Sequence, residues 1–374
     1  SINKSEKIIG RFPSLEDLFT RVEEYEDDIE HIVDDIEESL DEISEITEEI
    51  ILETLKTNDL SWEQEKKLEK TFDEANDIVE QIKDIQDNID KILDQSKDNN
   101  LFDSDLLEKF DQFNELLQNM MTDELLEAIE KLQESFQNLD KNKLMEALKN
   151  YEFNIDAFEE ELDRFIDMFE LALAEQKLNE LLEHMENMIN QQTNLINDIE
   201  NNKDQYTLEK KSRKQEHKFS EFEDILMESE QKLNDISKHT SEKLSDLVNS
   251  DLKKETANFL ENQTNDIKEK NDHSTNKNSA LSNLNDISNI LSEISDQFKN
   301  ESAEKMTKEF IIIIDNLLTI SNQQEKVNIK TIGARSNSPE LKLINQNQNN
   351  IDRSLNQIMK QLINLSNQTF FVDQ

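Results

Sequence analysis

The longest stretch of helical periodicity in the chain runs from Asn154 to about Asn202 and contains neither glycine nor proline. These two residue types most often end a helix, so the stretch predicts one helix of about 45 residues, roughly 70 Å long. Asn154 is the predicted N-cap, because its side-chain oxygen can accept from the free amides of a first turn. The apolar residues form two stripes of different phase: Phe158, Leu162, Phe165, Ile166, Phe169 and Leu173, then Leu178, Leu182, Met185, Ile189, Ile196 and Ile199. We interpret the first stripe as the spine of a local bundle and the second, which includes Gln192, as a narrower coiled-coil seam.

The chain as a whole is poor in helix-breaking residues and in the apolar residues that fill a thick core. It has two glycines and two prolines in 374 residues, and 34% of its residues are hydrophobic. A coiled-coil seam needs about two apolar residues in seven and a core-facing helix about three, so the observed fraction lies between them. We therefore predict an all-α fold of elongated long-helix hairpins and coiled coil, with a small local helical bundle.

Residues 14–98 predict a long helical hairpin, which follows an irregular lead-in at residues 1–13. Apolar residues recur every three or four positions in two segments: Leu15, Leu18, Val22, Tyr25, Ile29, Ile32, Ile36, Leu40, Ile43 and Ile50, then Leu68, Phe72, Ala75, Ile82, Ile89 and Leu93. Each segment begins with a capping box, and the pairs are Ser14 with Asp17 and Ser61 with Gln64. The break at Asn58 and Asp59 is short, which favours antiparallel pairing. Trp62, just after the second cap, is expected to seal the end of the hairpin.

Residues 99–202 predict short helices packed on the first half of the long helix. The short helices have predicted caps at Asp103, Thr122 and Asp140, and each is too short to be stable alone in water. We expect the core to form where their phenylalanines meet the first stripe; the residues are Phe110, Phe113 and Phe136 with Phe158, Leu162, Phe165 and Phe169. Met120, Met121, Met185 and Met188 are expected to fill this helical core.

Residues 203–330 predict an extended helical or coiled-coil region, and residues 331–374 a C-terminal helix after a loop at 331–338. One long helix with gaps is marked by Phe219, Phe222, Leu226, Leu233, Ile236, Leu244, Leu247 and Leu252, and a second helix by residues 281–320 after a polar break at 271–279. The last heptad stripe is Ile344, Ile351, Leu355, Ile358, Leu362 and Leu365. The Asn/Gln run at 345–350 puts amides on this seam. Buried amides can set coiled-coil register, and low-complexity drift in an AT-rich genome is the alternative explanation.

The net charge of −45 is concentrated in the first half of the chain. Residues 1–200 hold 58 acidic and 18 basic residues, whereas the remainder holds 28 and 23. Such a field repels nucleic acid and anionic membranes, because both are bound through Lys and Arg. It attracts basic proteins or divalent cations; alternatively, it is only a solvated face that keeps long helices in solution.

The residue types needed for catalysis are sparse, and we predict no catalytic, cofactor-binding or metal-binding residue. There is no cysteine, and two glycines cannot build a phosphate-binding loop or a dinucleotide fingerprint. The five histidines are scattered. Asp28 and His31 have the spacing of a di-iron bundle motif, but Ile29 and Ile32 are expected to take the inward face. Glu180 and Glu183 precede His184 at the wrong spacing for that motif.

No apolar run is long enough to cross a bilayer, since the longest, residues 310–314, is interrupted by Asp315. The absence of cysteine does not assign a compartment. We expect the chain to be a fragment, with any anchor or signal outside it.

Five short strings occur in this order: IGRFPSLEDLF from Ile9, LSWE from Leu60, ALKNYEF from Ala147, AEQKL from Ala174 and TFFV from Thr369. Together they resemble the helical region of a bacterial membrane-anchored family catalogued as a domain of unknown function (number 4175). The resemblance covers nearly the whole chain and is strongest in residues 1–200. It implies a membrane anchor before the first residue and further helix after the last, and it carries no catalytic residue. Family helices tend to begin with Ser/Thr-Pro; here Asp103-Ser104 and Thr122-Asp123 keep the cap and lack the proline.

The sequence favours a non-enzymatic structural scaffold or spacer, the soluble helical part of a membrane-anchored protein of the bacterial cell envelope. We expect protein partners, possibly basic ones, or self-association, with no nucleic acid, no cofactor and membrane attachment only through an anchor outside this chain. The alternative is a binding module whose acidic hairpin engages a basic partner. A metal-dependent helical enzyme is the third hypothesis, and metal retained through chelation would favour it.

Overall fold

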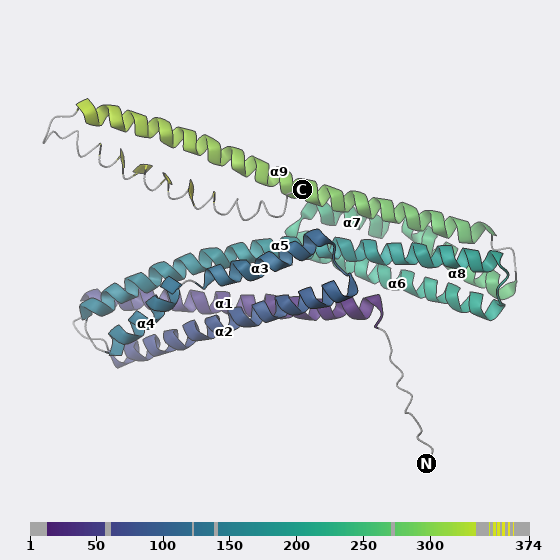
Figure 1. The fold of residues 1–374 in the computed structure, drawn as a ribbon, viewed down its shortest axis with the longest axis horizontal. Coiled ribbons are helices and arrows are strands. Elements are labelled where there is room, and N and C mark those ends of the chain that lie inside the picture. Colours follow the sequence, from purple (N-terminus) through teal and green to yellow (C-terminus); the bar gives the residue numbers. More distant parts are fainter. Residues whose placement is uncertain are drawn as a thin grey trace, which may run out of the picture. The chain divides into compact units, whose positions relative to one another are not determined.

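The computed structural model describes residues 13–56, 61–121, 123–137, 141–270 and 274–333, and scattered positions from Ile344 to Leu362. Within these residues every regular element is helical and none is a strand, which confirms the all-α prediction. The helices, labelled in Figure 1, are α1 (Leu15–Lys56), α2 (Trp62–Asn99), α3 (Ser104–Met120), α4 (Asp123–Gln137), α5 (Lys141–Glu200), α6 (Gln205–Ile236), α7 (Lys238–Asn249), α8 (Asp251–Glu269) and α9 (Ser274–Gly333). The chain divides into two compact units, Ser1–Met188 and Ile189–Gln374, and the boundary falls within α5.

In the first unit, α1 and α2 lie side by side and run antiparallel. Lys67 pairs with Glu49 at 2.6 Å, Lys70 pairs with Glu42, and the Lys91 ammonium lies 5.3 Å from the centre of the Tyr25 ring. As positions on α2 rise, their partners on α1 fall, as antiparallel pairing requires. Both predicted capping boxes are present, at Ser14 with Asp17 and at Ser61 with Gln64. Whether the pair supercoils as a coiled coil stays a prediction.

The seam of α1 is a ladder of β-branched residues at seven-residue spacing. Val22, Ile29, Ile36, Ile43 and Ile50 are all buried. On α2 the corresponding buried residues are Leu68, Ala75, Ile82 and Ile89, with Ile78, Ile85 and Ile92 beside them. Burial of each such side chain contributes about 1.5–3 kcal/mol, so the seams supply most of what holds the two helices together.

The predicted aromatic core lies between α3 and α5. The Phe113 ring is 5.7 Å from both Phe165 and Phe169, in edge-on arrangements, and Phe110 contacts Phe113 and Phe169 in the same way. Phe158 and Leu162 are also buried, and Asp103 caps α3, as predicted. Phe136 is half-buried, and its ring lies 5.8 Å from that of Phe72 on α2, a pairing that the sequence did not predict. The predicted Thr122 cap lies outside the described residues.

Helix α5 begins earlier than predicted and is one helix of 60 residues. Asn154 lies in its interior and donates its side-chain amide to the Asn150 carbonyl oxygen at 2.7 Å, so the N-cap prediction was wrong. The reason is that Tyr151 and Ile155 are buried and continue the apolar stripe across the junction. The predicted third short helix is therefore the start of the long one, and its predicted cap, Asp140, lies outside the described residues.

In the second unit, the predicted single long helix between Phe219 and Leu252 is broken at two serines, so that prediction was wrong. Ser237 and Ser250 leave helical geometry and accept hydrogen bonds from the amides of Thr240 and Lys253, as N-caps of α7 and α8. The breaks let the chain fold back. The Ser241 hydroxyl donates to the Glu230 carbonyl oxygen across the α6–α7 turn.

These helices form a bundle with the end of α5 and the first part of α9. Lys211 on α6 pairs with Asp198 on α5, Lys253 on α8 pairs with Glu223 on α6 at 3.3 Å, and Asn276 on α9 bonds Asp266 on α8. Helix α9 extends past both predicted limits, from Ser274 to Gly333, so the predicted polar break is shorter and the loop begins later than expected. The rest of that loop lies outside the described residues.

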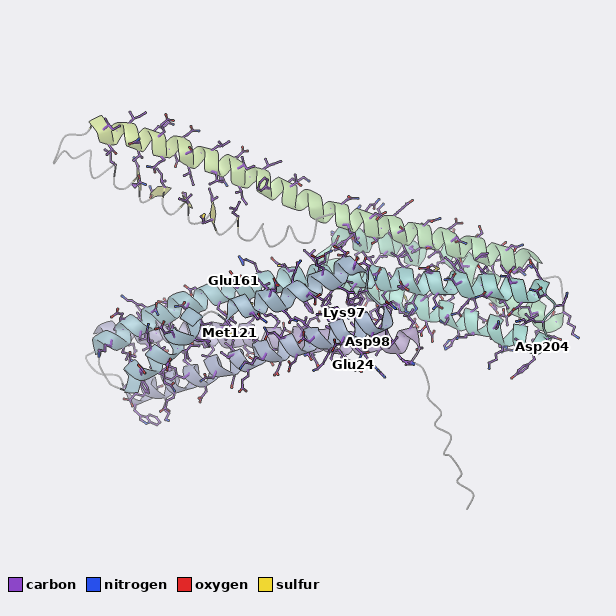
Figure 2. All side chains as sticks on the ribbon, viewed as in Figure 1. Glu24, Lys97, Asp98, Met121, Glu161 and Asp204 are labelled. Atoms are coloured by element: carbon purple, nitrogen blue, oxygen red, sulfur yellow. The ribbon has the colours of Figure 1, made fainter. Side chains whose placement is uncertain are left out.

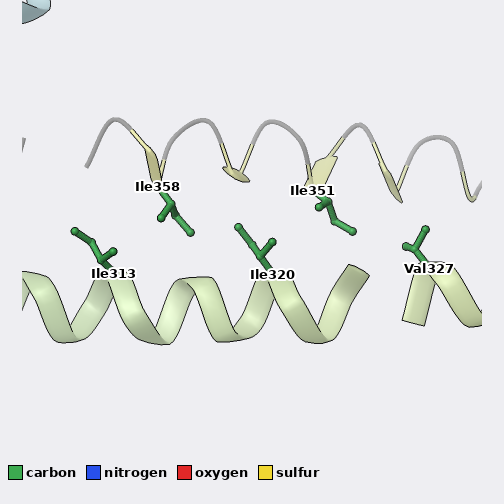
Figure 3. Close-up of a cluster of buried hydrophobic side chains, with 5 residues drawn as sticks. All are labelled: Ile313, Ile320, Val327, Ile351 and Ile358. Atoms are coloured by element: carbon green, nitrogen blue, oxygen red, sulfur yellow. The ribbon is translucent and has the colours of Figure 1, made fainter. Parts of the chain in front are cut away.

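The far part of α9 pairs with the last described positions of the chain, which are helical. Ile313, Ile320 and Val327 form a buried cluster with Ile351 and Ile358, and Ile344 packs against it. Figure 3 shows Ile313 facing Ile358 and Ile320 facing Ile351. The seven-residue spacing on both segments and their opposed order make an antiparallel pair. We call α9 from Phe310 onward, together with the described positions from Ile344 to Leu362, the C-terminal hairpin.

Candidate functional site

The residues considered for metal chemistry do not form a metal site in the described part of the chain. No group of three or more His, Asp or Glu side chains there could hold a metal ion. Asp28 and His31 are exposed, while Ile29 between them is buried in the α1 seam. Across the same residues, no helix is long and apolar enough to cross a membrane.

His184 lies in a buried acidic setting that its sequence spacing did not reveal. Its side chain is 4% exposed, with Nδ1 3.9 Å from a Glu16 carboxylate oxygen and Nε2 3.9 Å from one of Glu180. Glu180 is on the same helix, whereas Glu16 comes from the first turn of α1. The arrangement places the start of α1 beside the middle of α5.

Next to this histidine, Lys177 forms a buried ion-pair cluster between α1 and α5. It pairs with Glu23, and its Nζ lies 3.3 Å from a Glu180 oxygen. Burial alone lowers the pKa of Lys177, but Glu180, Glu23 and Glu26 outweigh it and hold that pKa above its usual value. The ammonium therefore stays charged, and the cluster acts as a structural tie.

Lys109 makes a similar tie between α3 and α5. Its ammonium lies 2.6 Å from Glu175 and 2.9 Å from Asp105, and the lysine side chain is 2% exposed. The roles of Lys109 and Lys177 were not predicted from the sequence. The sequence signal that could have identified them is an isolated basic residue between the apolar residues of a stripe. In this half of the chain acidic residues outnumber basic ones three to one, so such a residue is rare.

One antiparallel register relates α1 to α5, and the charges that face each other differ along it. Near the start of α1, Glu16 and Glu23 meet His184 and Lys177. Towards its other end, acids interact with acids. Burial and then the charges of Asp163, Asp34 and Asp41 raise the pKa of Glu37. Burial, followed by Asp156 and Glu48, likewise raises the pKa of Glu152.

The side chains on the outer face of α1 include many acids, such as Glu24, which is exposed and labelled in Figure 2. The first unit therefore has one end where basic side chains pair with acidic ones, and another end where acidic side chains lie next to one another. Only the second resembles the acidic surface that the composition predicted.

In the second unit, buried amides and hydroxyls form a hydrogen-bond network across the bundle. The Gln192 amide donates to Gln263 at 2.6 Å and to the Lys277 carbonyl oxygen at 3.1 Å. The Gln263 amide donates to the Ser212 hydroxyl at 3.0 Å, and that hydroxyl lies 2.9 Å from Thr264. Gln192 thus lies on the seam as predicted, and four helices contribute to a network that fixes their mutual register.

A small cavity of about 280 Å³ lies beside α7, α8 and α9. Its lining mixes aliphatic residues, among them Leu247 and Ile294, with charges of both signs, including Lys243 and Glu293. Its lining contains no histidine and no pair of groups arranged as nucleophile and base, so we interpret it as a packing gap between helices.

The exposed apolar residues are concentrated in the C-terminal hairpin. Among the described residues, sixteen large hydrophobic side chains are exposed, and eleven of them belong to this hairpin. They are Phe310, Ile311, Ile312, Ile314, Leu317, Leu318, Ile329, Ile332, Leu355, Met359 and Leu362. A concentration of this kind marks an interaction surface more often than chance exposure does.

Among the described aromatic side chains of the first unit, Trp62 is the one that is exposed. It is 73% exposed, so the prediction that it seals the end of the hairpin was wrong. Gln64, two residues further on, is buried there instead and completes the capping box. Met120, Met185 and Met188 are buried as predicted, whereas Met121 is only partly so.

In comparisons with known proteins, no family model, no curated protein and no solved structure matches the chain.

Proposed function

We propose that the protein is a non-enzymatic helical scaffold or spacer. One observation carries the proposal: α5 is a single 60-residue helix whose side chains form buried ties in each unit. In the first unit the ties are Glu175, Lys177 and His184; in the second they are Gln192 and Asp198. These polar groups pair with neighbouring helices, which is the use expected of a framework.

The resemblance to the membrane-anchored bacterial family supports the further proposal that this framework extends from an anchor outside the chain into the cell envelope. A spacer in that position needs length and a surface that stays in solution. Long helices supply the first, and the strong negative charge supplies the second.

The scaffold proposal is tested by cross-linking the full-length protein in the cells that make it, followed by mass spectrometry of the linked peptides. A scaffold is expected to give the same protein neighbours, at fixed stoichiometry, through exposed lysines such as Lys66 and Lys97. The control is the same chain with both lysines replaced by glutamine, which should lose those links and keep its abundance. Absence of any stoichiometric neighbour, together with turnover of a small molecule by the purified protein, would contradict the proposal.

A second candidate, an acidic module that binds a basic protein, is favoured by the raised pKa values of Glu37 and Glu152. Glu37 is exposed and Glu152 is half-buried, each beside like charges, and a cationic partner would relieve this repulsion. Binding should then lower both pKa values and release protons.

The test for this candidate is calorimetry with a lysine-rich peptide at low salt, near about pH 5, in buffers of different ionisation enthalpy. Proton release that falls in a Glu37→Gln, Glu152→Gln variant is the expected result. No binding at low ionic strength would remove this candidate and leave the scaffold proposal intact.

A further inference from the structure

The C-terminal hairpin has two parallel rows of seam residues, and only one row is covered. The covered row pairs Ile313 with Ile358 and Ile320 with Ile351 and continues to Val327 (Figure 3), and Ile344 packs against the same cluster. The second row begins where Gln324 and Gln348 exchange hydrogen bonds of 3.0 and 3.1 Å between their amides.

One and two heptads from this amide pair, the second row becomes apolar. Moving seven residues back along α9 and seven forward along its partner reaches Leu317 with Leu355, then Phe310 with Leu362. These four side chains are 37–48% exposed, although they occupy seam positions of both helices. The two helices of the hairpin therefore leave one of their two rows of seam residues exposed to solvent.

The open row continues into a wider apolar surface on the same side of each helix. Ile311, Ile314 and Leu318 lie at spacings of three and four along α9, next to the open row, and Met359 lies between Leu355 and Leu362 on the partner segment. All four are exposed. We call these eight residues the apolar face: Phe310, Ile311, Ile314, Leu317, Leu318, Leu355, Met359 and Leu362.

The charge of this part of the chain identifies the kind of partner. From Met306 to the last residue there are six acidic and seven basic residues, against a net charge of −45 for the whole chain. A strongly basic or acidic partner gains little from a surface without net charge. A partner that is itself apolar and neutral, with matching seven-residue spacing, fits it.

We propose that the apolar face binds the same face of a second copy of this chain, which turns two hairpins into a four-helix bundle. Antiparallel hairpins with one open row are self-complementary. A two-fold axis that lies in the plane of the contact and passes through the centre of the face places the open row of one copy against the open row of the other. Eight partly exposed side chains per copy offer on the order of 600 Å², close to the roughly 800 Å² per partner of a standard interface. This inference stands apart from the scaffold proposal, because it depends only on the hairpin.

The test uses sedimentation velocity of the full chain over a concentration series. Wild type should form dimers, and Ile314→Gln with Leu318→Gln should weaken dimerisation at least about 100-fold, since two exposed apolar contacts are lost. Ile312→Gln is the matched control: Ile312 is 56% exposed but points away from the face, two positions from Ile314. Added salt should tighten the dimer by screening the acidic remainder of each copy.

A second measurement keeps the test decisive if the double variant loses helix. Ile314 and Met359 lie nearest the proposed axis, and the chain has no cysteine of its own. Ile314→Cys should form a disulfide-linked dimer on mild oxidation, whereas Ile312→Cys should not. Three results would each overturn the proposal: a monomer at every concentration, equal cross-linking by both cysteines, or a monomer that floats with neutral lipid vesicles through the same face.

Discussion

At the scale of single residues, the aromatic core should carry a large share of the stability of the first unit. Phe165 is fully buried and contacts Phe113 and Phe169. Phe165→Ala should lower the free energy of unfolding by about 3–5 kcal/mol, because it removes these contacts and leaves a cavity. Chemical denaturation followed by circular dichroism measures the loss. Trp62→Ala, at an exposed position, should change stability by less than about 0.5 kcal/mol. Similar losses in both variants would refute the assigned core.

Lys177 should matter far more than the lysines on the surface. Lys177→Met leaves the buried Glu180 and the half-buried Glu23 without their cation, and we expect a loss of about 3–5 kcal/mol in the free energy of unfolding. Lys67→Met removes an exposed pair with Glu49 and should cost at most about 1 kcal/mol. The two variants are compared by urea denaturation. Adding Glu180→Gln to Lys177→Met should recover part of the loss, and no recovery would show that the two groups are not coupled.

At the scale of helices, the start of α5 can be tested by whether one substitution raises or lowers the stability of the protein. If Asn154 lies inside the helix, Asn154→Ala should stabilise the protein by up to about 0.5 kcal/mol, because alanine is the better helix former. An N-cap would instead lose about 1 kcal/mol. Asp103→Ala provides the comparison, since Asp103 does cap α3 and should show that loss. Thermal unfolding distinguishes the two outcomes, and a destabilised Asn154→Ala would restore the predicted break.

The end of α1 where acids accumulate should be the part of the first unit most sensitive to pH and salt. Glu37 and Glu152 have folded pKa values above their ordinary values, so the unfolded chain releases these protons at lower pH than the folded one. Stability should therefore fall as pH rises through that window, and lowering the pH from about 7 to about 5 should stabilise this end.

Amide hydrogen exchange of residues 34–50, compared with residues 19–26, measures this effect, after correction for intrinsic exchange rates. We expect protection of residues 34–50 to increase at the lower pH and at higher salt, and Glu37→Gln to reduce both responses. Residues 19–26, tied to Lys177, whose ammonium stays charged, should respond less. An equal response in both segments would show that the charge asymmetry along α1 has no energetic consequence.

At the scale of the whole chain, the sequence predicted the helices well and their ends less well. Seven-residue ladders such as Val22 to Ile50 and Ile351 to Ile358 indicated buried seams directly, because periodicity depends only on local spacing. The breaks at Ser237 and Ser250 were missed because serine is tolerated inside helices, and its role as a cap depends on where the chain packs afterwards.

The candidate sites were harder to predict because they join distant parts of the chain. The contacts of Lys177 with Glu23 and of Gln192 with Gln263 depend on the relative register of separate helices, which no local pattern specifies. The open row of the C-terminal hairpin was hard to predict for a similar reason. Its heptads were visible in the sequence, but which row is covered depends on how the two segments pair.

The central claim is that α5 is one continuous helix that serves as a structural element in both units. The most direct test is a distance measured by double electron–electron resonance between spin labels at Lys149 and Asn190, which are both exposed on α5. The absence of native cysteine lets the labels attach only at these introduced sites. Forty-one residues of unbroken helix predict a single narrow distribution centred at about 62 Å. A broad distribution, or a mean shorter by about 10 Å or more, would contradict the account.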